Sequence, residues 1–130
     1  MTSTRRTFLL GAAAATSTAL ATDRKPVRVA VVGTGGRGCD LIRALSTIDS
    51  ATLVAVCDDY PPHLERGAKY AGEAAKRFDR YDRMLAEAKA DAIVIATPLH
   101  LHYEMAMEAL RRDLPVFCEK SLCRHLGDAK

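Results

Sequence analysis

A glycine-rich loop is the first feature of this 130-residue chain that could bind a ligand. Gly33, Gly35 and Gly38 form a Gly-x-Gly-x-x-Gly pattern directly after the β-branched run 27–32. The first glycine allows a tight turn, the second lets a phosphate approach the backbone, and the third lets the following helix pack closely on the strand. Free N–H groups at the start of that helix favour an anionic ligand. The pattern predicts a dinucleotide site, with a plain glycine turn as the alternative.

An acidic residue lies where such a site would bind a ribose. Asp58 ends the apolar run 52–57 and follows Gly38 at the expected spacing of about 20 residues. A carboxylate there accepts hydrogen bonds from the ribose hydroxyls and repels a 2′-phosphate, so we expect NAD to be preferred over NADP. Asp59 is a weaker candidate for the same role. A helix cap or a solvated loop acid is the alternative for both.

Two more polar clusters each follow an apolar run, and their members are Thr97, Pro98, His102, Glu119 and Lys120. Ligands of open α/β sheets bind beyond the carboxyl ends of the strands. Since four polar clusters follow four strand-like runs, we expect them to contribute to one site.

Four motifs in this order resemble the Gfo/Idh/MocA family, the relatives of glucose–fructose oxidoreductase and inositol dehydrogenase. The motifs are VGTGGRG at 32–38, AVCD at 55–58, IATPLHLH at 95–102 and CEKS at 118–121. The resemblance covers the chain from residue 27 to about residue 130. Two residues depart from the family pattern, because Leu99 replaces the usual asparagine and Ser121 replaces the proline that follows Glu-Lys.

The resemblance implies an oxidoreductase that transfers a hydride between NAD and a hydroxyl-bearing carbon of a sugar or polyol. It assigns the cofactor site to Gly33, Thr34, Gly35, Gly36, Arg37, Gly38, Asp58, Thr97, Pro98, His102, Glu119 and Lys120. It also implies that Lys120 is catalytic and polarises or deprotonates the substrate hydroxyl. An NAD-dependent glycosidase of the same family, or a non-catalytic NAD-binding fragment, are the alternatives. No metal site is expected.

Some of these roles have simpler alternatives. Arg37 either contacts a phosphate or is only solvated. His102 either lines the nicotinamide side or only packs at a helix start. Lys120 is either catalytic or an ordinary surface lysine. The three remaining histidines are expected to be solvated, and they are His63, His100 and His125.

Strand-like and helix-like segments alternate along the chain. We expect strands at 27–32, 52–57, 75–78, 92–96 and 114–118, and helices near 41–48, 61–76, 80–88, 100–112 and from 124 onward. Near-continuous apolar strands predict a parallel sheet covered on both faces, here an α/β, Rossmann-type doubly wound sheet. The inward helix residues are expected to be Leu41, Ile42, Leu45, Ile48, Leu101, Met105, Ala109 and Leu110.

The resemblance also bears on domain organisation. Residues 22–130 are expected to be an NAD(P)-binding Rossmann domain that stops before the sixth strand of the usual fold. Family members carry a second, α+β substrate domain that also forms the oligomer surface. We therefore expect a fragment of a longer enzyme that forms a homo-oligomer only with that domain, with a stand-alone module as the alternative.

Residues 1–21 have the pattern of an export signal. Arg5 and Arg6 precede Phe8 and a short apolar stretch, and residues 19–21 match an A-x-A cleavage pattern. The segment resembles a twin-arginine signal and predicts a periplasmic protein, with a Sec signal or a disordered N-terminus as the alternative. The apolar part is too short to span a bilayer, so no stable membrane anchor is expected.

Composition excludes other classes of partner. The net charge is +3, and two of the positive charges belong to the predicted signal, so no basic surface for nucleic acid is expected. Aromatic residues make up only 5% of the chain, which disfavours base stacking. No spacing typical of a zinc site is present, so the four cysteines at positions 39, 57, 118 and 123 are expected to be free thiols.

Overall fold

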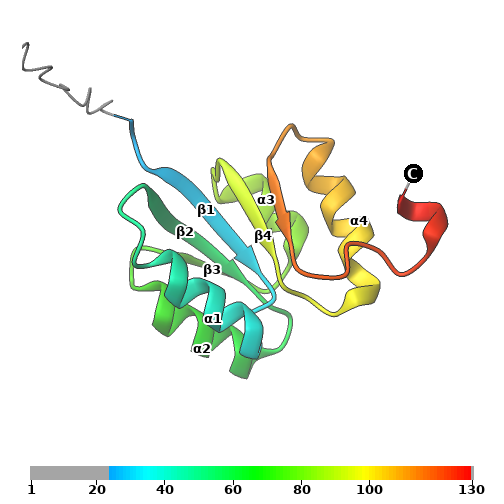
Figure 1. The fold of residues 1–130 in the computed structure, drawn as a ribbon. Coiled ribbons are helices and arrows are strands. Elements are labelled where there is room, and N and C mark those ends of the chain that lie inside the picture. Colours follow the sequence, from blue (N-terminus) through cyan, green and yellow to red (C-terminus); the bar gives the residue numbers. More distant parts are fainter. Residues whose placement is uncertain (1–23, 130) are drawn as a thin grey trace, which may run out of the picture.

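Five strands form one parallel sheet in the computed structural model, which describes residues 24–129. The strands are β1 (Val27–Val32), β2 (Ala51–Cys57), β3 (Lys76–Phe78), β4 (Ala92–Ile95) and β5 (Val116–Cys118). Their order in the sheet is β3-β2-β1-β4-β5, and every neighbouring pair is parallel (Figure 1). The strand order reverses between β1 and β4, which is where an open α/β sheet binds its ligands. The predicted export signal lies outside the described residues.

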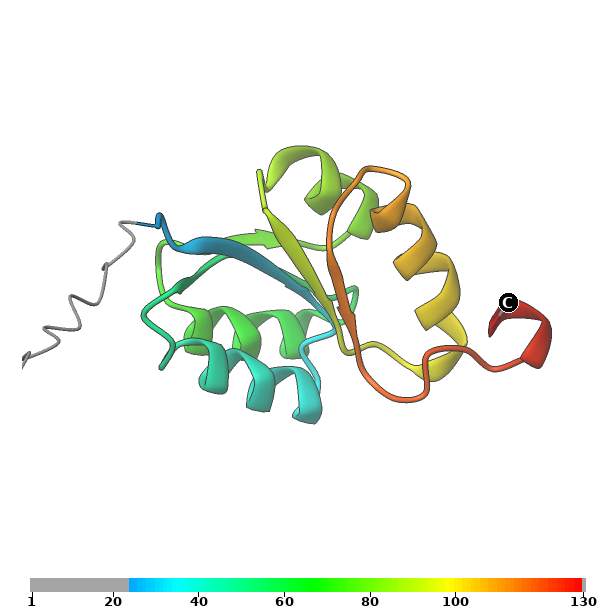
Figure 2. The same cartoon turned by 45° about the horizontal axis from the view of Figure 1, so that its top comes forward.

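The helices cover both faces of the sheet. They are α1 (Gly36–Leu45), α2 (Pro61–Ala71), α3 (Tyr81–Glu87) and α4 (Leu99–Leu110), followed by a short 3-10 helix, η1 (Leu126–Ala129). Helices α1 and α2 lie on one face, and α3 and α4 lie on the other (Figures 1 and 2). This arrangement confirms the predicted doubly wound, Rossmann-type α/β fold.

Strand β1 contributes alternate side chains to two separate hydrophobic clusters. Val29 and Val31 belong to the cluster formed with α1 and α2, whereas Ala30 and Val32 belong to the cluster formed with α3 and α4. This alternation follows from the two-residue period of a strand. Because both faces are covered, the strand is apolar throughout its buried part, which explains why the run could be recognised in the sequence.

Helix α2 is shorter than the sequence predicted. It ends at Ala71 rather than near residue 76, because Gly72 has a φ of +90° and caps the helix. The residues after Gly72 lead into β3 instead of extending the helix.

Two predictions of inward-facing residues were wrong. Ile48 is exposed because α1 already ends at Leu45, so Ile48 lies in the turn before β2. Leu110 is exposed because the buried stripe of α4 consists of His102, Ala106 and Ala109, and Leu110 lies one residue beyond it. The segment after residue 124 forms only the four-residue η1 and not the expected α-helix.

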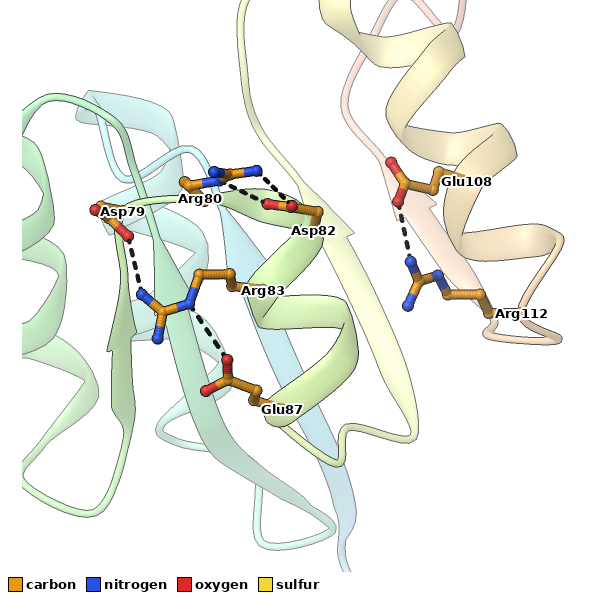
Figure 3. Close-up of polar contacts among 7 residues, drawn as sticks. All are labelled: Asp79, Arg80, Asp82, Arg83, Glu87, Glu108 and Arg112. Carbon is orange, nitrogen blue, oxygen red and sulfur yellow. Dashed lines mark hydrogen bonds and ion pairs between the residues drawn. The ribbon is translucent and has the colours of Figure 1, made fainter.

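Ion pairs cover the solvent side of the α3–α4 layer (Figure 3). They join Arg80 to Asp82, Arg83 to both Asp79 and Glu87, and Arg112 to Glu108. Exposed pairs of this kind contribute little to stability, and they keep this face polar. Within residues 24–129, no helix is long and apolar enough to cross a membrane. The same residues contain no group of three side chains suited to a metal ion.

Candidate dinucleotide site

Two glycines of the loop between β1 and α1 are required by the packing of the protein itself. Gly33 has a φ of +85°, and a Cβ there would lie 2.6 Å from the backbone carbon of Ala96, which follows β4. At Gly38, a Cβ would overlap the carbonyl oxygen of Gly33. The first and third glycines of the pattern therefore let the loop turn and let α1 approach β1, as the sequence predicted.

The glycines between them leave space that the protein does not fill. Gly35 has a φ of −64°, which any residue can adopt, and a Cβ there would meet only the His63 ring, at 3.7 Å. A Cβ at Gly36 would have no neighbour within 4 Å. The open space lies beside the first turn of α1, whose N–H groups have no acceptor within the helix. These residues therefore fit an anionic group such as the pyrophosphate of a dinucleotide.

Asp58 is held at the end of β2 by backbone N–H groups. The amide of Thr34 donates to Oδ2 over 2.7 Å, and the amide of Tyr60 donates to Oδ1 over 3.0 Å. The Thr34 hydroxyl also donates to Oδ2, over 3.3 Å. A carboxylate has about four acceptor positions, so Oδ1 can still accept from a ribose hydroxyl. Thr34 is itself fully buried beneath Gly67 of α2, where a Cβ would lie 2.5 Å from the Thr34 side chain. Gly67 was not among the residues predicted from the sequence, although a glycine inside a helix can mark close packing.

A cavity of about 600 Å³ opens at the carboxyl ends of β1, β2 and β4. We call it the aspartate-side cavity. It brings together the predicted residues Gly33, Gly35, Gly36, Arg37, Asp58, Thr97 and Pro98. Its wall also contains residues that the sequence analysis did not assign to the site, among them Tyr60, His63, Tyr81, Leu101 and Met105. Most of the exposed wall is apolar, and three carboxylates and one guanidinium add charged groups, a combination that suits a small organic ligand.

His63 is a wall residue that sequence analysis expected to be solvated. Its ring packs edge-on against Tyr60, with ring centroids 4.9 Å apart. Its Nδ1 atom lies 3.7 Å from Oδ2 of Asp58. The only sequence signal was the position of His63 in the first turn of the helix that follows Asp58.

A second cavity of about 420 Å³ lies at the carboxyl ends of β4 and β5, and we call it the lysine-side cavity. It brings together the predicted residues Arg37, Thr97, His102, Glu119 and Lys120, with Ala96 and Leu99. The two cavities share Arg37, Ala96 and Thr97. The residues expected to hold the two ends of a dinucleotide therefore line adjoining spaces.

His102 is buried and connects two loops. Its Nε2 lies 2.7 Å from the carbonyl oxygen of Thr97, and its Nδ1 lies 2.8 Å from the carbonyl oxygen of Ser121. The ring therefore fixes the segment after β4 to the segment after β5, next to the exposed Lys120. His102 therefore lines the lysine-side cavity and also packs at the start of α4, and its place beside a nicotinamide stays a prediction.

Arg37 pairs with Glu119. Its Nε donates to Oε1 of Glu119 over 2.9 Å, and its Nη2 lies 2.8 Å from the same oxygen. The guanidinium holds the pKa of the Glu119 carboxyl below its usual value, mainly through the side-chain hydrogen bond.

The four cysteines are free thiols, as expected. Cys39 and Cys57 are buried, and the Cys39 thiol donates to the carbonyl oxygen of Thr34. Burial raises the pKa of Cys57 to about 12. Burial also raises the pKa of the partly buried Cys118. These thiols pack as small apolar groups.

The sheet order, the glycine loop leading into α1 and the carboxylate at the end of β2 together define a dinucleotide-binding domain of the Rossmann class. Residues 27–130 match the family model described as the oxidoreductase family, NAD-binding Rossmann fold. The chain therefore belongs to the Gfo/Idh/MocA oxidoreductase family and contains its NAD-binding Rossmann domain.

Known relatives and solved structures agree with this membership. The chain is 36% identical to inositol 2-dehydrogenase 1 of Paenarthrobacter aurescens, over 81% of this chain and 31% of that protein. It is 33% identical to a glycosyl hydrolase family 109 protein of Stenotrophomonas maltophilia, over 88% of this chain and 29% of that protein. The WlbA dehydrogenase of Bordetella pertussis, solved with NADH and UDP-GlcNAcA, superposes with a TM-score of 0.75 at 33% identity, over 80% of this chain and 32% of that one. The chain spans about a third of the length of these proteins.

Proposed function

We propose that this chain is the cofactor domain of an exported oxidoreductase that acts on a hydroxyl-bearing carbon of a sugar or polyol. The observation that carries the proposal is the pair of adjoining cavities. One contains the glycine loop and Asp58, the other contains Lys120, and they share Arg37, Ala96 and Thr97. The similarity to an inositol dehydrogenase supports a polyol or sugar as the substrate class.

Each group of residues has a distinct task in this proposal. The first turn of α1 binds the pyrophosphate, and Asp58 accepts hydrogen bonds from the adenosine ribose. Bound NAD would supply the hydride acceptor and donor. Lys120 lies in the lysine-side cavity, where its side chain can polarise the substrate hydroxyl and take its proton. His102 keeps the loops around this cavity together.

The same geometry supports a preference for NAD over NADP. Asp58 faces the aspartate-side cavity with its carboxylate fixed by two backbone amides, and Asp59 lines the same cavity. Two carboxylates at this place repel a 2′-phosphate. The start of α2 offers no free backbone donors, because Pro61 and Pro62 lack an N–H and the amides of the next two residues already bond to the carbonyl of Tyr60.

Cofactor titration tests the proposal directly. The chain contains no tryptophan, so the fluorescence of NADH on binding can be read without overlap from protein tryptophan. We expect the full chain to bind NADH and to bind NADPH at least tenfold more weakly, which corresponds to about 1.4 kcal/mol. A chain that binds neither nucleotide contradicts the proposal, and equal affinities contradict the preference.

An NAD-dependent glycosidase is a second candidate, favoured by the similarity to the glycosyl hydrolase family 109 protein. Assays with NAD, a polyol panel and a panel of aryl glycosides separate the two. Conversion of a polyol to its carbonyl product, with the hydride kept on bound NADH or passed to an added sugar carbonyl, identifies the oxidoreductase. Release of the aryl group without net oxidation identifies the glycosidase. Binding of NADH with neither reaction shows that residues 1–130 bind the cofactor without turning over a substrate by themselves.

The proposal includes export of the protein from the cytoplasm through the twin-arginine pathway. Arg5 and Arg6, followed by an apolar stretch, support it. Free NAD is expected to be scarce outside the cytoplasm, so the enzyme keeps its cofactor bound and regenerates it within each cycle. Replacing both arginines with lysine should keep the protein in the cytoplasm, as measured by cell fractionation. Unchanged export of that variant contradicts this pathway.

A further inference from the structure

The pair formed by Arg37 and Glu119 joins distant parts of the chain. Arg37 is the second residue of α1, and Glu119 follows β5, 82 residues later. Both guanidinium contacts are made to the same carboxylate oxygen, at 2.9 Å from Nε and 2.8 Å from Nη2. From the sequence, Arg37 was expected to contact a phosphate or to be solvated and Glu119 to contact the cofactor, and their pairing was not predicted.

The pair lies between the two cavities. Arg37 lines both the aspartate-side and the lysine-side cavity, and Glu119 lines the second. A dinucleotide that occupies both cavities, with its pyrophosphate beside Gly35 and Gly36 of the aspartate-side cavity, must pass Arg37, which lines both. The side chains of Arg37 and Glu119 therefore meet where such a ligand must cross from one cavity to the other.

The side chains of Glu119 and Arg37 differ in how exposed they are and in how freely they can move. The Glu119 side chain is only 15% exposed, and its backbone N–H donates to the carbonyl oxygen of Ile95 over 2.9 Å. The Arg37 side chain is 60% exposed. Glu119 thus provides a fixed acceptor, and the long arginine side chain can detach and return. Because Nε and Nη2 contact Glu119, the remaining guanidinium N–H groups are available to donate to other acceptors, such as phosphate oxygens.

We propose that Arg37 and Glu119 form a latch over the pyrophosphate of the bound dinucleotide and that the latch must open before the cofactor leaves. Glu119 is then a positioning residue that acts through Arg37. The latch slows cofactor release, which is what an exported enzyme that retains its cofactor requires. This inference rests on the proposed function, because it needs a dinucleotide in the site.

Release kinetics test the latch. NADH is bound to the full chain, excess NAD is added in a stopped-flow instrument, and the loss of bound-NADH fluorescence gives the dissociation rate. We expect Glu119→Gln to accelerate release about threefold to tenfold, as for loss of a partly buried charge-assisted contact. Arg37→Gln should accelerate release at least as much, since it also removes a phosphate contact.

The double variant identifies the mechanism. If Glu119 acts through Arg37, Glu119→Gln has no further effect on release once Arg37→Gln is present. The latch is overturned if the two effects multiply, which means that Glu119 contacts the cofactor independently. It is also overturned if Glu119→Gln alone leaves release unchanged or slows it, because the carboxylate would then be idle or would compete with the phosphate for Arg37.

A matched ion pair provides the control. Arg28 and Asp91 form a similar contact, with Nη2 2.7 Å from Oδ1, at the amino ends of β1 and β4 and away from both cavities. Asp91→Asn should leave the NADH release rate unchanged. Failure of the wild-type chain to bind NADH refutes the proposed function together with the latch, whereas normal binding with multiplying effects refutes the latch alone.

Discussion

Different glycines of the loop serve two different purposes. One allows the protein to pack, and the other leaves room for a ligand. We predict that Gly38→Ala destabilises the protein and that Gly35→Ala instead weakens NADH binding. At Gly38, the new Cβ would overlap the carbonyl oxygen of Gly33, which is backbone and cannot rotate away. At Gly35, the nearest atom would be 3.7 Å away, in the ring of His63, and the φ of −64° is ordinary.

The magnitudes follow from these contacts. Overpacking costs about 1–3 kcal/mol, and the obstacle at Gly38 places that variant at the upper end. Alanine returns up to about 1 kcal/mol in helix propensity, so we expect a net loss of about 2 kcal/mol for Gly38→Ala. For Gly35→Ala, a helix N-cap residue changes to a weaker cap, which costs about 0.5 kcal/mol. Gly35→Ser restores the cap while keeping the added volume.

Urea unfolding followed by circular dichroism measures the stability, and NADH fluorescence measures the affinity. We expect both Gly35 variants to bind NADH at least tenfold more weakly, which is about 1.4 kcal/mol of binding free energy, at nearly normal stability. The reasoning is refuted if Gly35→Ala is as destabilising as Gly38→Ala, or if Gly35→Ser binds NADH like the wild type.

Three further predictions concern single side chains. Asp58→Asn should weaken NADH binding about tenfold or more and reduce the preference for NADH over NADPH. The substitution removes a charged acceptor of the ribose hydroxyls and, with it, the repulsion of a 2′-phosphate. Titrations with NADH and NADPH measure both effects, and an unchanged preference contradicts the ribose role of Asp58. Arg28 holds the pKa of Asp91 down at about 2, below the usual 3.8, so the stabilisation from this carboxylate is complete above about pH 4 and is lost as the pH falls toward 2. Asp91→Asn should therefore flatten the dependence of unfolding free energy on pH in that window, and a curve that still falls as steeply as the wild-type curve argues against the pair. Burial raises the pKa of Cys57 to about 12, so its thiol should resist iodoacetamide at pH 8 in the native protein and react after unfolding. Peptide mass spectrometry measures the labelling, and rapid labelling of the native thiol contradicts this prediction.

Much of the fold could be predicted because the strands are buried on both faces. A run such as 27–32 is apolar at every buried position, and the residue after it is a glycine with positive φ. The positions of Asp58 and Glu119 followed in turn, since each comes directly after a strand. Once the strands are known to be parallel, their carboxyl ends must lie at one edge of the sheet. The residues that follow the strands can then be placed together there from the sequence alone.

The facing of helix residues was harder to predict. Leu110 has the residue type of a core position, but the stripe that α4 buries is set by its contacts with β4 and β5, and Ala109 occupies the inward position instead. Part of the wall of the aspartate-side cavity was missed for the same reason. Tyr81 and Met105 come from α3 and α4, and the bond from the Tyr81 hydroxyl to the carbonyl of Met105 joins helices whose relative placement no local pattern encodes.

The contact between Gly33 and Ala96 also has a consequence for the order in which the protein can form during synthesis. Strand β1, the glycine loop and α1 leave the ribosome well before β4, yet the loop is supported by the backbone of Ala96. The nascent chain therefore holds an incomplete nucleotide site until β4 has docked beside β1. A ligand stabilises the species that binds it, so the nucleotide should stabilise the chain most strongly once β4 has completed the site.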